Sequence, residues 1–177
     1  MQHAERVFPR LDKWYKDFSS RQSSLLHPDL VQFLEFRYHH LLNILSAYPL
    51  RVRLNCPNPC FDDVEPYLQS AIKVVTWSLN YSAAALRSIQ LNQGHGNANK
   101  SELPVSFSWL CACKFHFEFA VDCILGVCSY FEKRGFAPEY LKGIRTRILH
   151  QQSIYTPISH NGLCWLESGL SDVINRE

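Results

Sequence analysis

The sequence predicts an all-α protein, an irregular bundle of about five to six helices that forms a single domain over residues 1–177. Three observations lead to this prediction. Apolar residues recur at helical spacing, proline and asparagine gather between the apolar segments, and no internal repeat interrupts the pattern. With 46% apolar and 19% charged residues, the chain has enough hydrophobic side chain to order one core.

Two helices are expected in the first part of the chain. A short helix covers residues 11–18, where apolar side chains fall at i, i+3, i+4 and i+7. A stronger second helix begins at Pro28 and ends at Pro49. Its buried face, which we expect to pack against the helix containing Ala71 and Ile72, consists of Tyr38, Leu41, Leu42 and Leu45.

A loop and a third helix should follow. Prolines and asparagines place the loop between Pro49 and Asp63. The third helix starts near Asp63, tolerates Pro66 only within its first turn, and is either long or broken near Asn80. A flexible loop is then expected over residues 92–104, where glycine and asparagine replace the apolar period.

The most apolar part of the chain is the segment 105–131. Its apolar residues are too dense for one stripe, which is typical of a central helix. Alternation over 105–119 leaves a strand as the alternative. Gly135 should end the central helix, Pro138 should begin another, and a last, weaker helix is expected over 165–174.

Charge and hydropathy argue against several classes of protein. The net charge of +2 is spread along the chain, and the densest basic stretch, 142–147, alternates with apolar residues as a solvated helix face would. Direct nucleic-acid binding is therefore not expected. No run of about 18 apolar residues occurs, so we expect no membrane span. Residues 1–10 lack an apolar signal core, which favours an intracellular protein.

The seven cysteines are an odd number in a chain that is not short, which favours reduced thiols. The pair Cys56 and Cys60 has C-x3-C spacing in a loop, but no second pair follows at an interval that a structural zinc site would use. No metal ligand is therefore assigned. Four others should be buried as small hydrophobic side chains, namely Cys111, Cys113, Cys123 and Cys128.

Catalytic motifs are absent from the sequence. There is neither a nucleophile elbow nor a phosphate-binding loop, so no catalytic residue is assigned and the protein is not expected to be an enzyme. Glu35 and His39 stand at i, i+4 and are expected to form a surface pair, because the second Glu/His set of a helical metal site is missing.

The alternative hypothesis is a small helical metal-binding protein or enzyme. Its site would consist of Cys111, Cys113, His116 and Glu118, in which H-x-E echoes the zinc deaminases but the required P-C-x-x-C does not follow. In a helix, His116 and Glu118 lie about 200° apart. We therefore expect these two side chains to point to different sides.

Several segments together resemble a known family. Trp14-Tyr15 matches a W-Y pair, and residues 36–49 read as aromatic-x-Tyr-His followed by apolar residues and a proline. Residues 67–75 carry a small residue in an x-x-A-x-x-I/V pattern, and Pro138-Glu139 matches a helix start. In this order the segments resemble the C-terminal part of the regulatory region of fungal zinc binuclear cluster transcription factors, the middle homology or fungal-specific transcription factor domain.

The resemblance implies a regulatory module that controls transcription in the nucleus through helix packing, dimerisation or effector binding. Its partners would be a second copy, the remainder of a longer transcription factor, or a small-molecule effector. The family's zinc lies in an N-terminal C-x2-C-x6-C cluster that this chain does not contain, so no cofactor and no direct DNA contact are expected. The upstream half of the region is also missing, which should leave an exposed apolar face. A helical adaptor for partner proteins remains a further alternative.

Overall fold

The protein is an all-α bundle. A computed structural model describes residues 2–21, 28–93 and 103–174. The described residues form five helices and no strand, which confirms the predicted fold class. These helices are α1 (Gln2–Arg21), α2 (Pro28–Leu54), α3 (Phe61–Gln93), α4 (Leu103–Glu132) and α5 (Pro138–Ile174).

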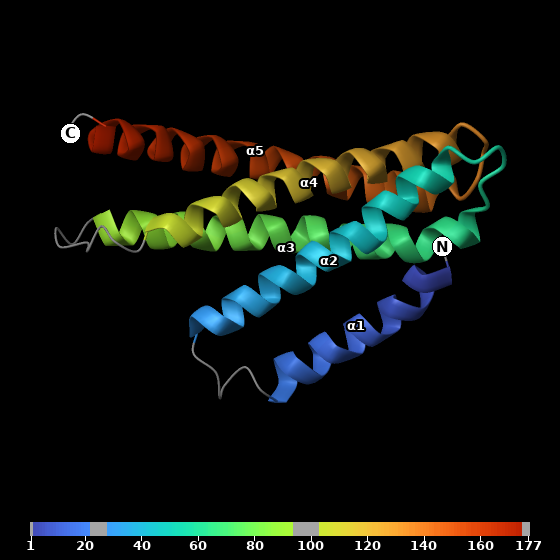
Figure 1. Ribbon diagram of the computed structural model, residues 1–177. Coiled ribbons are helices and arrows are strands. Elements are labelled where there is room, and N and C mark those ends of the chain that lie inside the picture. Colours follow the sequence, from blue (N-terminus) through green and yellow to red (C-terminus); the bar gives the residue numbers. More distant parts are fainter. Residues whose placement is uncertain (1, 22–27, 94–102, 175–177) are drawn as a thin grey trace.

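The helices form two layers and an outlying arm (Figure 1). Helices α3, α4 and α5 run side by side and contact one another. Helix α2 crosses in front of α3 and α4 and contacts both. Helix α1 lies at the edge and packs mainly on α2. One long face of α2 is therefore left as the front of the molecule.

The core lies where α2, α3, α4 and α5 meet. Leu42 and Leu50 of α2 are at most 1% exposed, so they are inserted as deeply as any side chain in the bundle. Each fully buried side chain of this size contributes about 1.5–3 kcal/mol of transfer free energy. The other large side chains that are almost completely buried are Val64, Leu68, Val74, Val75, Phe117, Val121, Ile124, Val127, Leu141 and Ile148.

Helix α2 extends further than the sequence predicted. Pro49 lies inside the helix instead of ending it, although proline removes a backbone donor from the ladder. The last turn buries Leu50 completely and packs Leu54 against the core. This burial offsets the lost hydrogen bond, so the helix continues to Leu54.

Helix α3 is also longer than predicted, because the prediction allowed Pro66 only within its first turn. It begins at Phe61, so Pro66 is beyond the first turn, and it continues past Asn80 without a break. The added first turn is fixed by Phe61, whose ring meets that of Phe131 edge to face at 5.2 Å, and by Val64, which is fully buried. Tertiary packing thus outweighs the local effect of the proline.

In the second half of the chain, the described residues form α4 and α5, joined by a turn at residues 133–137. Residues 105–119 belong to α4, so the strand alternative is wrong. Gly135 ends this segment with a positive φ of 71°, and its N–H donates to the carbonyl of Glu132 at 2.9 Å. Pro138 begins α5 as predicted, but the expected last helix is continuous with α5.

Two other predictions concern the loop at residues 92–104 and the buried face of α2. The predicted loop 92–104 falls mostly on residues outside the described ranges, and its ends belong to α3 and α4. Tyr38 and Leu42 are buried, and α2 packs on α3 as expected, but Leu41 is 45% exposed, so its assignment to the core was wrong. Helix α2 is apolar on several sides, and periodicity alone did not show which side faces inward.

Candidate functional site: the front face of α2 and the histidine chain beside it

Helix α2 carries an exposed apolar stripe along its whole length. The spacing is three or four residues throughout, with Arg37 as the only charged position in the series, so all members lie on one side of the helix. Each apolar side chain in the stripe is 38–53% exposed, although it is large. The apolar members are Leu30, Phe33, Leu41, Ile44, Tyr48 and Val52.

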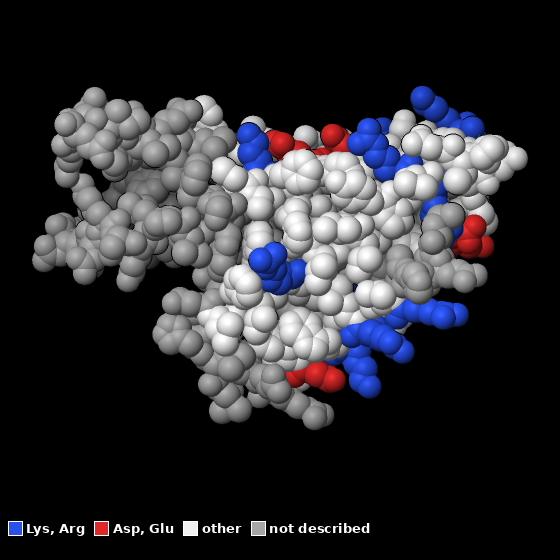
Figure 2. All heavy atoms as spheres, in the orientation of Figure 1, with Lys and Arg blue, Asp and Glu red and all other residues white. Residues whose placement is uncertain are grey.

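Helix α4 widens this stripe into a continuous surface. Phe115 is 55% exposed and stacks on Phe119 at 6.0 Å, and Phe119 meets the ring of Tyr48 at 4.8 Å. We call the six stripe residues together with Phe115 and Phe119 the front face. Figure 2 shows this side of the molecule as a broad uncharged area with most charged groups toward its edges.

Charged groups border the front face on its α4 side. The guanidinium of Arg51 lies over the ring of Phe119 at 6.0 Å, and Lys114 pairs with Glu118 at 3.9 Å. Within the stripe, the guanidinium of Arg37 lies 5.1 Å from the centre of the Phe33 ring. An apolar centre with a polar rim is the usual anatomy of a protein interface.

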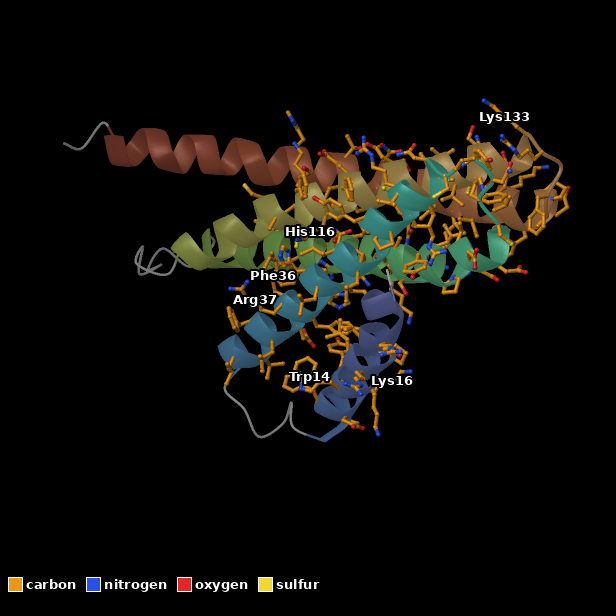
Figure 3. The ribbon with its side chains drawn as sticks, turned by 45° about the vertical axis from the view of Figure 1, so that its right-hand side comes forward. Trp14, Lys16, Phe36, Arg37, His116 and Lys133 are labelled. Atoms are coloured by element: carbon orange, nitrogen blue, oxygen red, sulfur yellow. The ribbon has the colours of Figure 1, made fainter. Side chains whose placement is uncertain are left out.

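A buried chain of polar side chains joins α2 to α4 next to the front face. Nδ2 of Asn43 donates to Nδ1 of His116 at 2.8 Å. The remaining proton of the neutral His116 ring then lies on Nε2, which donates to Nδ1 of His40 at 2.8 Å. Figure 3 shows His116 reaching from α4 toward α2 near Phe36, and the two rings are 6.4 Å apart.

The environment keeps these imidazoles neutral. Burial, followed by the proximity of His40, lowers the pKa of His116 to about 4. Burial and the charge of Arg37 lower the pKa of His40. Because His116 is 4% exposed and both of its nitrogens are engaged, it fastens two helices and is not open to a ligand.

His39 is a core residue and not half of a surface pair. Its ring stacks on Trp77 at 4.2 Å and meets Tyr38 edge to face at 4.8 Å. It is 7% exposed, and burial lowers its pKa to about 3. Glu35 is half-buried, and burial raises its pKa. The expected exposed Glu35–His39 pair is therefore wrong, because α3 covers His39.

The four residues of the alternative metal or enzyme site do not converge. Cys113 and His116 are buried, whereas Cys111 and Glu118 are exposed. Residues two positions apart lie about 200° apart around a helix, which explains both separations. The prediction that His116 and Glu118 point to different sides is confirmed. Burial of Cys111 was predicted and is wrong.

The other cysteines whose side chains the structure describes fall into two groups. Cys123 and Cys128 are buried as expected, and burial raises the pKa of each thiol to about 11. Cys56 and Cys60 are exposed free thiols between α2 and α3. The Cys56 thiol donates to the carbonyl of Val52 at 3.6 Å. In the described part of the chain, no group of three or more His, Cys, Asp or Glu side chains is arranged to hold a metal ion.

An open pocket of about 440 Å³ lies where α1, the end of α2 and the start of α3 meet. Arg53 and Asp63 approach to 3.8 Å on its wall, and the Arg53 guanidinium lies over the Tyr67 ring at 5.0 Å. Lys73 and Asp12 approach to 3.7 Å on another wall. Both signs of charge thus line the pocket, and the cations are already engaged by carboxylates.

The chain matches no protein-family model, no curated protein and no solved structure. Among the described residues, no helix combines the length and hydropathy that a membrane span needs. His116 stands out in the sequence through its H-x-E spacing, whereas nothing in the sequence pattern indicates its partners His40 and Asn43. The exposed stripe on α2 was not predicted either, although Leu30, Leu41 and Val52 follow one another at a constant spacing of 11 residues, which could have indicated it.

Proposed function

We propose that the protein is a regulatory module that controls transcription by docking other protein segments on its front face, without contacting DNA directly. The proposal takes its class from the resemblance to the regulatory region of fungal zinc binuclear cluster transcription factors. The nucleus is accordingly the proposed location. Two features support it: the helix that carries the aromatic-x-Tyr-His segment lies against three other helices, and the front face on that same helix is accessible.

The observation that carries the proposal is the size of the front face. Seven large apolar side chains on two adjacent helices are each more than a third exposed. Surfaces of this kind mark protein interaction sites, because leaving them in water forfeits about 25 cal/mol for each Å².

The histidine chain supports docking by making the front face rigid. His116 fastens α4 to α2 beside the stripe through hydrogen bonds to His40 and Asn43. The relative position of Tyr48 and Phe119 on the two helices is thereby fixed. A rigid face loses less conformational entropy when a partner docks, and so binds it more tightly.

A tethering experiment tests the proposed function. The chain is fused to a heterologous DNA-binding domain, and a reporter gene with the matching site is measured in fungal cells. We expect the fusion to change reporter output and Leu41→Glu to abolish that change. The matched control is Leu149→Glu on α5, where the leucine is 47% exposed, against 45% for Leu41, and lies outside the front face.

Two results would contradict the proposal. One is a fusion that enters the nucleus and leaves reporter output unchanged. The other is an equal loss with Leu41→Glu and Leu149→Glu, which would make the effect one of general surface charge. Metal analysis of the purified chain tests the alternative class separately, because stoichiometric zinc or iron would favour a metal-binding protein.

A further inference from the structure

We propose that the front face is a two-fold interface between two copies of this chain, in which α2 packs antiparallel against α2 of the second copy around Leu41. This inference rests on the proposed function, because it names the protein that docks on the front face. Three properties of the stripe point to a second copy. These are its symmetry, its area and the position of its charge.

The stripe is symmetric about Leu41. Leu30 lies 11 positions before it and Val52 lies 11 positions after it. Phe33 lies eight positions before Leu41, and Tyr48 lies seven positions after it. A two-fold axis through Leu41 therefore pairs Leu41 with its own copy, sets Leu30 opposite Val52, and brings Phe33 to within one residue of the position opposite Tyr48. Such self-complementarity is what an isologous interface requires.

The stripe also remains on one side of the helix for its full length. A spacing of 11 residues in three turns corresponds to about 3.67 residues per turn, close to the 3.6 of a straight α-helix. The stripe therefore hardly winds around α2 between Leu30 and Val52. In Figure 1, α2 lies in front of α3 and α4, on the outside of the bundle.

The exposed area matches what a dimer needs. The six stripe side chains and Phe115 are 38–55% exposed. With about 150–250 Å² for each large side chain, the exposed apolar area is roughly 500–800 Å² per copy. A standard stable interface buries about 800 Å² on each partner. The polar rim around Arg51 and Glu118 would supply the remainder.

The charge within the stripe selects the antiparallel arrangement. A parallel pair would bring Arg37 against Arg37 of the second copy. In the antiparallel pair the two Arg37 residues are separated by eight residues of helix, or about 12 Å, which exceeds the screening length of about 8 Å at physiological salt. Each Arg37 then faces the helical turn between Ile44 and Tyr48 of the other copy. There its guanidinium can form a cation–π contact with the Tyr48 ring.

Sedimentation equilibrium of the purified chain over a range of concentrations tests the dimer. We expect the wild-type chain to reach twice the monomer mass, and Leu41→Glu to remain a monomer, because it places two carboxylates together on the axis. Leu149→Glu should dimerise like the wild type. Circular dichroism of each variant checks that the helices are intact. A wild-type chain that stays monomeric at every concentration overturns the proposal, as does a Leu41→Glu variant that is folded and dimeric.

A charge pair tests the register and does not depend on Leu41. Phe33→Lys alone and Tyr48→Glu alone should each weaken dimerisation at least tenfold. The double variant should recover most of that loss, because each lysine then faces a glutamate of the other copy. No recovery in the double variant would rule out the antiparallel register.

The two proposals fail separately. A monomeric chain whose reporter effect is still abolished by Leu41→Glu would overturn the dimer and leave the regulatory docking face in place. A dimeric chain without any reporter effect would overturn the transcriptional role and leave the interface in place.

Discussion

Nε2 of His116 and Nδ1 of His40 lie 2.8 Å apart, although the two residues are separated by 76 positions in the sequence. This hydrogen bond, together with that from Asn43, lies between two helices whose apolar side chains also share the core. Apolar contacts tolerate small shifts of one helix along the other, whereas a bifunctional imidazole fixes a single register. The front face that spans α2 and α4 therefore has one defined shape.

The same relationship makes the protein sensitive to acid. The pKa of His116 is lowered from 6.5 to about 4 by burial, so below pH 6.5 the unfolded chain takes up a proton that the folded chain does not. The free energy of unfolding should fall by about 1.4 kcal/mol per pH unit from this residue between pH 6 and pH 4. Above pH 7 this residue should contribute no pH dependence.

A variant separates His116 from the other buried histidine. Urea unfolding of His116→Gln between pH 7 and pH 4 should show a shallower fall, and the slope that remains should come mainly from His39, whose pKa is lowered to about 3. The prediction is wrong if the wild type and His116→Gln lose stability in parallel over this range.

Two adjacent leucines on α2 should differ strongly in their contribution to stability. Leu42 is 1% exposed, and Leu42→Ala should lower the free energy of unfolding by about 2–5 kcal/mol, because it leaves a cavity in the core. Leu41 is 45% exposed, and at chain concentrations low enough to keep the protein monomeric Leu41→Ala should change it by less than about 0.5 kcal/mol. Chemical denaturation measures both, and similar values for the two variants would contradict the described orientation of α2.

Two glycines should respond in opposite directions to the same substitution. Gly135 has a φ of 71°, which is unfavourable for a residue with a Cβ atom, so Gly135→Ala should destabilise the protein by about 1–2 kcal/mol. Gly143 lies within α5, and a Cβ atom there meets nothing within 4 Å, so Gly143→Ala should stabilise it by about 0.5–1 kcal/mol. Thermal unfolding of both variants provides the comparison.

The six thiols that the structure describes should react in two groups. Cys56, Cys60 and Cys111 are exposed and should react with a maleimide in the native state within minutes. Cys113, Cys123 and Cys128 are buried, and burial raises the pKa of Cys113 to about 12, so these three should react only after unfolding. Peptide mass spectrometry after brief labelling identifies which sites are modified. Rapid native labelling of Cys113 would contradict its burial in α4.

The helix starts could be predicted from the sequence where proline and glycine control the backbone. Pro28 and Pro138 begin helices, and Gly135 marks the turn before the last one, because these residues restrict or permit φ locally. The helix ends were harder to predict from the sequence. Pro49 and Pro66 lie within helices because burial of Leu50 and Phe61, which depends on distant partners, outweighs a missing backbone donor.

The candidate site could be predicted only in part. The involvement of α4 follows from the apolar density of residues 105–131, and the opposite orientations of His116 and Glu118 follow from helix geometry. The pairing of His116 with His40 does not, because no periodicity links residues on different helices. The front face was missed for a related reason: Leu41 and Leu42 are chemically identical, and only the positions of α3 and α4 decide which of them is covered.

The separation between His40 and His116 has a consequence during synthesis. A ribosome adds about 5–20 residues per second, so His40 is joined to the chain roughly 4–15 seconds before His116. During that interval the α2 side of the hydrogen-bonded chain has only water as a partner, and the deep leucines of α2 can meet α3 alone. Nascent chains paused before α4 should therefore leave uncovered the part of α2 that later packs on α4 and depend on chaperones, whereas chains paused after α4 has left the ribosome should cover it.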